Sequence, residues 1–383
     1  MYKKWITLLA TVAMAAGTFA QSFPAYFKMY NTTIVDCDKD DLPDNLVIPE
    51  GVTGIGPSAF SQCMYLESVV IPGSVKKIDE DAFSGCTSLK SVTIENGVME
   101  IGLRAFKGCT SLVSVEIPGS VTIIKGGDYH GDGAFTGCTS LESIILPEGV
   151  TEIGKHTFNG SGVKNITIPS TIKKGSYAFT ICKSLESVIV AEGATMIAGG
   201  MFEGCTSLTS ITLPESVTEI GGGAFSGCTS LASITLPEGV TKSGWGAFSG
   251  CTSLASITLP ESVTEIGDGA FSASGLKSVT IPKGAKESGS RTFYECKLLE
   301  SVTLPRGATH IPTEDFLGCT SLKTISIPRN VTSIHLNAFK GCNNLTVQFD
   351  GTKEQWNAIS TEFPSIGNFA VHCTDGDYGK QNW

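Results

Sequence analysis

Cysteine is the chemically reactive residue that recurs most regularly in this chain of 383 residues. Eleven of the 13 cysteines stand in the sequence G-C-T-S-L or a variant of it, mostly 23 residues apart. These are Cys63, Cys86, Cys109, Cys138, Cys182, Cys205, Cys228, Cys251, Cys296, Cys319 and Cys342. Thiols at regular spacing suggest three kinds of chemistry, namely disulfide formation, metal binding and nucleophilic catalysis.

Histidines do not accompany these cysteines. The five histidines belong to different repeats, and none shares a predicted strand face with a nucleophile and an acid. They are His130, His156, His310, His335 and His372. The chain also contains no G-x-S-x-G, no H-E-x-x-H and no phosphate-binding loop. We therefore expect a protein that is not an enzyme, with no catalytic residues, no cofactor and no metal site.

One acidic segment near the N-terminus bears on the expectation that the protein has no metal site. Residues 36–44, D-C-D-K-D-D-L-P-D, have the spacing of a calcium loop of the form D-x-D-x-D-G-x-x-D. Asp41, however, occupies the position where such a loop needs glycine for its sharp turn. The favoured interpretation is a solvated loop of an N-terminal cap, and calcium binding by this segment stays an open alternative.

The elements that position the cysteines follow from a repeat marked by thirteen phenylalanines between Phe60 and Phe339. In one copy, residues 231–236, the apolar residues Leu231, Ile234 and Leu236 are separated by small or polar residues. This alternation predicts a strand with one buried face. Pro237 ends that strand, because proline cannot donate to a sheet ladder. No ten-residue segment of a repeat has helical periodicity. Units this small cannot bury their own apolar side and must stack.

The predicted fold class is therefore a β-rich solenoid, a right-handed stack of about thirteen 23-residue units with a parallel sheet on one face. Equivalent residues then form columns, with neighbouring thiols about 4.8 Å apart and pointing in parallel. Parallel thiols do not face each other as a disulfide requires, nor do they converge on a metal. We interpret the column as small buried thiols that pack at the turn before each strand. Cys37 and Cys373 lie outside the pattern, at opposite ends.

The repeat also identifies a family. The motif G-C-T-S-L-x-S-I-T-L-P-x-x-V-T-x-I-G-x-x-A-F, over residues 45–350, resembles the leucine-rich repeats of BspA-like surface proteins of Bacteroidetes, their relatives and some protozoan parasites. The resemblance implies a leucine-rich-repeat solenoid and adhesion to host matrix proteins or other cells. It also implies that residues 349–359 form the closing element, in which Trp356 covers the last turn. The short polar segment 372–383 is expected to be loose.

The N-terminus predicts export. Lys3 and Lys4 precede an apolar run over residues 6–16, and small residues follow up to Ala20. The predicted domains are a signal peptide (1–20), an N-terminal cap with a first partial repeat (21–58), BspA-like repeats (59–350) and a C-terminal cap with a short tail (351–383). We expect a secreted or cell-surface protein without membrane insertion after cleavage.

Charge limits the partners of this protein. The formal net charge is −10 at pH 7, and removal of the two signal-peptide lysines takes it to −12. Such a surface repels phosphate backbones, which argues against nucleic acid and anionic membranes. The expected partner is an extracellular protein. A glycan bound to the Ser/Thr strand face and a structural spacer without any ligand are the alternatives.

Three groups of residues are candidates for binding that partner. One edge of the stack carries charges that change sign along the rod: Glu192, Glu215, Glu238 and Glu261, then Lys283, Arg306 and Arg329. The outer strand face carries small hydroxyls, including Thr212, Thr235 and Thr258. A six-residue insertion in the third unit holds Asp128, Tyr129 and His130, and we expect it to loop out of the stack. Solvated edge charges and ordinary strand-forming residues remain the simpler explanation for the first two groups.

Overall fold

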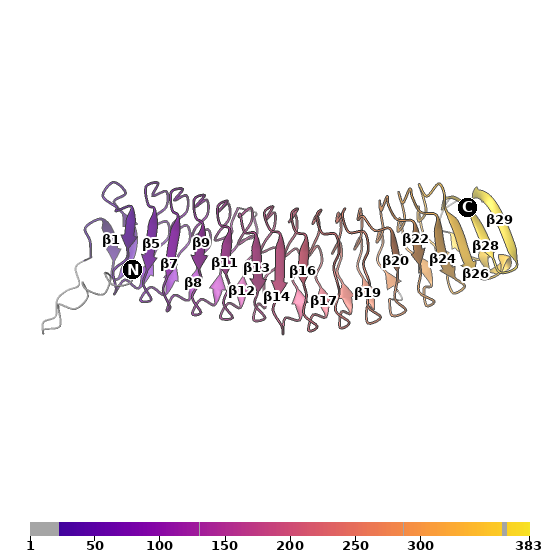
Figure 1. Ribbon diagram of the computed structural model, residues 1–383, viewed down its shortest axis with the longest axis horizontal. Helices are drawn as coiled ribbons and strands as arrows, with labels where there is room; N and C mark the ends of the chain where they lie inside the picture. The colour runs from indigo at the N-terminus through magenta and orange to yellow at the C-terminus, as the bar shows by residue number, and fades with distance from the viewer. Residues whose placement is uncertain (1–22, 130, 286, 362–365) are drawn as a thin grey trace.

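The computed structural model describes residues 23–129, 131–285, 287–361 and 366–383. The chain winds into an elongated, gently curved solenoid whose successive turns lie side by side from indigo to yellow (Figure 1). The fold class predicted from the repeat is confirmed. The predicted signal peptide and His130 lie outside the described residues.

One face of the solenoid carries the longer strands, which form two sheets. Within each sheet, the strands of successive turns pair in parallel. The first sheet has eight strands: β3 (Asn45–Val47), β5 (Ser68–Ile71), β7 (Ser91–Ile94), β9 (Ser114–Glu116), β11 (Ser143–Ile145), β13 (Asn165–Ile168), β14 (Ser187–Val190) and β16 (Ser210–Thr212). The second begins with β20 (Ser278–Thr280), β22 (Ser301–Thr303), β24 (Thr324–Pro328) and β26 (Thr346–Asp350). We call this face the long-strand face.

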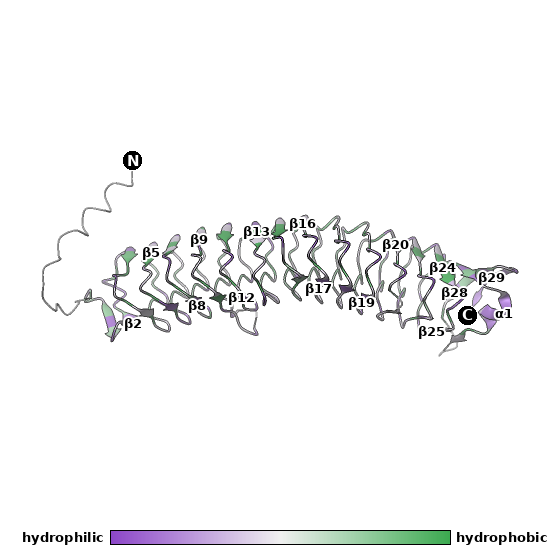
Figure 2. Ribbon diagram, turned by 90° about the horizontal axis from the view of Figure 1, so that it is seen from below, coloured by the Kyte–Doolittle hydropathy of each residue, from purple (hydrophilic) through white to green (hydrophobic). Residues whose placement is uncertain are grey.

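The opposite side carries two-residue strands, so the solenoid has further sheets on a second face in addition to the predicted one (Figure 2). These strands are β4 (Gly54–Ile55), β6 (Lys77–Ile78), β8 (Glu100–Ile101), β10 (Ile123–Ile124), β12 (Glu152–Ile153), β15 (Met196–Ile197), β17 (Glu219–Ile220), β18 (Lys242–Ser243), β19 (Glu265–Ile266), β21 (Glu287–Ser288), β23 (His310–Ile311), β25 (Ser333–Ile334) and β27 (Ser360–Thr361). Most of these strands contain the second apolar position of their repeat, whereas β18 and β21 have a serine there. We call this the short-strand face.

The two most similar repeats deviate from the strand prediction. Residues 231–236 and 254–259 form no strand, and only one isolated bridge, Thr235 to Thr258, joins them. Ile234 and Ile257 nevertheless stay buried. Alternation of residue types determines which side chains point inward, but it does not determine whether the backbones come close enough for ladder hydrogen bonds.

A column of phenylalanines forms the centre of the core. Phe225 and Phe248 are fully buried, and their rings stack with centroids 5.5 Å apart and planes 12° apart. The same stacking recurs from Phe60 to Phe339. The insertion in the third unit does not interrupt the stack, because β10 pairs directly with β12.

Antiparallel hairpins close both ends of the solenoid. At the N-terminus β1 (Phe27–Tyr30) pairs with β2 (Thr33–Cys37), which in turn pairs with β4. At the C-terminus the short helix α1 (Lys353–Asn357) precedes the hairpin of β28 (Asn368–Cys373) and β29 (Gly376–Asn382). Hairpins of this kind cover the apolar end of a repeat stack, which would otherwise face water.

The C-terminal hairpin corrects the expectation of a loose tail and confirms the role of Trp356. Trp356 is buried, and its ring meets that of Trp383 edge-on at 5.5 Å. The Trp383 indole N–H donates to the carbonyl of Phe369 at 2.9 Å. The polar composition of the tail did not indicate a strand, because its contacts, such as that of the Tyr378 hydroxyl with Asn357, are made with residues outside the tail.

Candidate partner-binding surfaces

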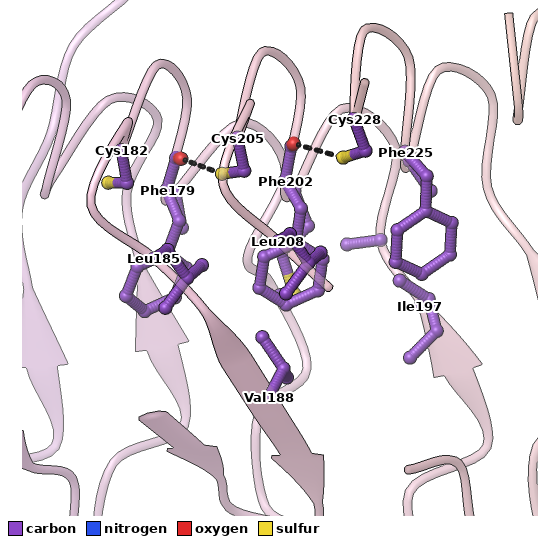
Figure 3. Close-up of a cluster of buried hydrophobic side chains, with 14 of the residues drawn as sticks. Phe179, Cys182, Leu185, Val188, Ile197, Phe202, Cys205, Leu208, Phe225 and Cys228 are labelled. Carbon is purple, nitrogen blue, oxygen red and sulfur yellow. Dashed lines mark hydrogen bonds between the residues drawn. The ribbon is translucent and has the colours of Figure 1, made fainter. Parts of the chain in front are cut away.

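The cysteine column is part of the packing, as the sequence predicts. The Cys205 thiol donates to the Phe179 carbonyl at 3.1 Å and the Cys228 thiol donates to the Phe202 carbonyl at 3.2 Å (Figure 3). Burial raises the pKa of Cys251 to about 12, so its thiolate is scarce at neutral pH. All thirteen cysteines are free thiols, and all but Cys373 are buried.

The column extends further than the repeat pattern indicates. Cys37, in the N-terminal hairpin, lies with its sulfur 3.6 Å from that of Cys63, so placing it outside the column was wrong. Where two shortened repeats lack cysteine, Ser161 and Ser274 take its position and contact the next thiol. The hairpin brings Cys37 to this position without any of the repeat letters around it, so spacing alone could not show it.

Buried thiols should react slowly. In the native protein we expect a thiol reagent to modify Cys373 rapidly and the other twelve cysteines at least a hundredfold more slowly, because modification requires local opening. The measurement is the rate at which the thiols react with the reagent, before and after denaturation in urea. A Cys373→Ser variant is the matched control and should lose the fast phase. Rapid native labelling of most column cysteines would contradict this packing.

The acidic segment at residues 36–44 gathers no metal site. Asp36 pairs with Lys28 at 2.5 Å, and the Asp38 carboxylate accepts the backbone N–H of Asp40 at 3.2 Å. In the part of the chain that the structure describes, no three His, Cys, Asp or Glu side chains converge as metal ligands would. These contacts are those of the solvated cap loop that the sequence favours.

The described histidines make different contacts along the solenoid. His156 contacts the Thr180 hydroxyl at 2.9 Å, and His372 pairs with Asp377 at 2.8 Å. His310 and His335, about one repeat apart in the sequence, occupy neighbouring turns with ring centroids 5.6 Å apart.

The structure brings the seven predicted edge charges into one exposed column. All of them follow the end of a strand position on the long-strand face, and all are exposed: Glu192, Glu215, Glu238, Glu261, Lys283, Arg306 and Arg329. At the change of sign, the Lys283 backbone N–H donates to the Glu261 carboxylate at 3.4 Å. We call this column the signed edge.

Within the described residues, the first six side chains of the signed edge form no ion pair, and Arg329 reaches Asp350 at 3.7 Å. The opposite edge of the same face differs, because there lysine and glutamate alternate between turns and pair at 2.7–2.9 Å. Those pairs are Lys90 with Glu67, Lys164 with Glu142 and Lys323 with Glu300. Among the described residues, six of the seven charges of the signed edge therefore form no ion pair, whereas three lysines of the opposite edge are paired.

The outer side of the long-strand face is mixed rather than uniformly hydroxylic. Thr212, Thr235 and Thr258 are exposed as predicted. Further toward the N-terminus the equivalent positions hold Ile145, 68% exposed, and Ile189, 54% exposed. Sequence reasoning missed these isoleucines, although the alternation of their strands places them outward. The face thus offers apolar contacts beside hydroxyl groups.

A groove adjoins the basic end of the signed edge. It has a volume of about 450 Å³, lies over the second sheet of the long-strand face, and is lined by Arg306, Gln348 and His372 among others. Arg306 thus belongs both to the signed edge and to the lining of this groove.

The insertion of the third unit forms a separate surface. Asp128 is exposed and pairs with Lys155 at 2.7 Å, and Tyr129 is 77% exposed. Asp128 and its neighbouring glycines line a hollow of about 380 Å³ together with Lys155, Lys173 and Lys174. The described residues of this loop follow β10 of the short-strand face, so the predicted site residues that the structure describes fall into two separate regions.

The described part of the chain contains no helix long and apolar enough to cross a bilayer.

Comparisons with known proteins identify the repeat. A model of the BspA type leucine rich repeat region, in six copies, matches residues 41–129, 129–232 and 218–346. A search of curated proteins finds no match.

Three solved structures are similar over most of their length. A leucine rich cell surface protein from Faecalibacterium prausnitzii shares 27% identity over 91% of this chain and 99% of that chain, with a TM-score of 0.46. A leucine-rich repeat protein from Bacteroides ovatus shares 25% over 89% and 94%, with a TM-score of 0.51. The pneumococcal vaccine antigen PcpA shares 20% over 89% and 92%, with a TM-score of 0.57, and supports the fold alone. The repeat region matched by the family model spans most of the chain, which therefore belongs to the BspA-type leucine-rich repeat family.

Proposed function

We propose that this protein is a non-enzymatic adhesion scaffold, secreted or held at the cell surface, that binds an extracellular protein such as a host matrix protein. The long-strand face and its signed edge form the binding surface. The observation that carries the proposal is the signed edge, whose charges are sorted by sign and, apart from Arg329, form no ion pair within the described residues.

Electrostatics explains why this arrangement favours a partner. Successive turns lie 5.5 Å apart at the phenylalanine column, so like charges on the edge repel by about 0.8 kcal/mol per neighbouring pair in water before screening. That repulsion does not stabilise the folded protein. A partner with the opposite order of charge would remove it and be held in one register along the rod.

The face beside the edge supplies the remaining contacts. Ile145 and Ile189 offer exposed apolar surface, and the threonines offer hydroxyl donors and acceptors. Apolar centres with polar surroundings are typical of protein interfaces. An extended partner along successive turns would meet this face, the groove at Arg306 and the edge together.

Charge reversal tests the proposal. We expect K283E/R306E/R329E to weaken binding about tenfold, because three rim charges at roughly 0.5 kcal/mol each sum to about one decade. The measurement is biolayer interferometry of residues 21–383 on immobilised fibronectin, fibrinogen, laminin and collagen. The loss should shrink between 50 and 500 mM NaCl as screening grows.

The matched control is K90E/K164E/K323E, which makes the same change in net charge on the opposite edge. Equal loss in both triple variants would show general repulsion and contradict the role of the signed edge. Absence of binding to all four matrix proteins would instead favour a structural spacer.

A further inference from the structure

A second surface lies on the short-strand face, around Trp245. The indole is 61% exposed, whereas Trp356 is buried in the C-terminal cap. Trp245 lines a polar hollow of about 630 Å³ above β17, β18 and β19. An indole left in water exposes a large apolar surface that packing elsewhere in this chain removes.

Glycines hold the indole in place and form the floor of the hollow. A Cβ atom added at Gly222 would lie 2.3 Å from the indole Nε1, and one at Gly223 would lie 3.7 Å from its Cη2. The ring therefore rests on the bare backbone of the preceding turn. Gly244 and Gly267 also line the hollow, so the surface beside the ring is backbone without side chains that would fill it.

Charged side chains surround the ring. Glu219, Lys242 and Glu265 stand in register on β17, β18 and β19, with Lys242 and Glu265 paired at 3.1 Å. Asp268 follows one turn after Trp245 and also lines the hollow. Three carboxylates against one ammonium make the hollow acidic, with hydrogen-bond acceptors in excess.

This combination matches a sugar ring. A hexopyranose has one face of C–H groups, which pack on the π face of an indole, and a rim of hydroxyls, which donate to carboxylates and accept from an ammonium. We propose that the Trp245 hollow binds a neutral hexopyranose unit of a glycan. The excess of carboxylates repels sialylated and sulfated sugars.

A protein segment fits the hollow less well. Protein hot spots need several apolar or aromatic anchors in a desolvated pocket, and here a single ring stands among glycine backbone and charges. The hollow lies on the face opposite the long-strand face and shares no residue with the signed edge. It therefore stands independently of the adhesion proposal.

Binding of neutral oligosaccharides tests the proposal. The probes are cellohexaose, laminarihexaose, maltohexaose and lacto-N-tetraose, followed by indole emission and by an array that also carries sialylated and sulfated glycans. For any oligosaccharide that the wild type binds, we expect Trp245→Ala to weaken the affinity at least tenfold. Trp245→Phe should retain part of the wild-type affinity. Wild-type emission should shift to shorter wavelength as the sugar covers the ring.

Tyr65→Ala, which removes another exposed aromatic (78% exposed), is the matched control and should bind as wild type does. Thermal unfolding of Trp245→Ala should be unchanged, because the ring is mostly exposed. Binding of no neutral glycan, binding of acidic glycans only, equal loss in Tyr65→Ala, or loss of a protein partner without any sugar bound would each overturn the assignment.

Discussion

Replacing Phe225 with alanine is expected to lower the free energy of unfolding by about 3–5 kcal/mol, the range for removing a fully buried phenylalanine. Its ring lies between those of Phe202 and Phe248, at 5.8 and 5.5 Å, in the middle of the column. Truncation removes both stacking contacts and leaves a cavity that a rigid stack cannot close. The measurement is urea denaturation followed by circular dichroism.

The position of Phe225 adds a second expected effect. Each turn of a repeat stack contacts only its neighbours, so a weakened central turn uncouples the two halves. We expect the unfolding transition to be broader than that of the wild type or to split, and limited proteolysis to cleave near residue 225 first. Phe225→Leu is the matched control and should lose less than half as much stability. A loss below about 1 kcal/mol in Phe225→Ala would contradict the central role of the column.

Asp315 should make the stability of the protein depend on pH. It occupies the position where most repeats have the alanine of A-F, and its side chain is almost fully buried at 1% exposure. The backbone N–H of Thr292 donates to its carboxyl at 2.8 Å. Burial outweighs the hydrogen bonds from Thr292 and raises the pKa of Asp315 from 3.8 to about 7.

The sign of the effect follows from proton binding. Between the two pKa values the unfolded chain has released the proton of Asp315 while the folded chain retains it. The free energy of unfolding therefore falls as the pH rises from about 4 to about 7 and is level above that range. A shift of this size corresponds to a loss of at most about 4 kcal/mol.

Asp315→Ala isolates this contribution. We expect the variant to be more stable than the wild type by about 2 kcal/mol or more at pH 8, and the difference to shrink or reverse at pH 4. Asp315→Asn is the matched control, since it keeps the hydrogen-bond acceptor and removes the charge, and it should flatten the pH profile as well. A stability difference that is the same at pH 4 and pH 8 would show that Asp315 does not titrate in this range.

The repeat letters predicted the inward-facing residues well. Leu231, Ile234 and Leu236 are buried where their alternation places them, and the cysteines and phenylalanines form the expected columns. Stacking identical turns is close to a repeated translation, so each residue meets its own equivalents above and below. One turn therefore specifies the core of all of them.

The repeat pattern did not predict the features that lie outside the repeat. Cys37 joins the column from a hairpin, and Trp383 anchors a tail that reads as loose, because both depend on contacts with residues outside the local pattern. The exposure of Ile189 could be predicted from the alternation of side chains along its strand. The hollow at Trp245 could not be predicted from the sequence. That hollow requires a glycine of the preceding turn to lie beneath the ring.

The sequence by itself determined the solenoid, its core columns and the residues of the signed edge, because all three follow from the spacing of residue types along one repeating turn. Only the tertiary structure decided which charges are paired, how the ends are closed and where the surface is hollowed. Those features depend on distances between side chains of neighbouring turns, and equal spacing in sequence does not distinguish a lysine that meets a glutamate from one that meets water.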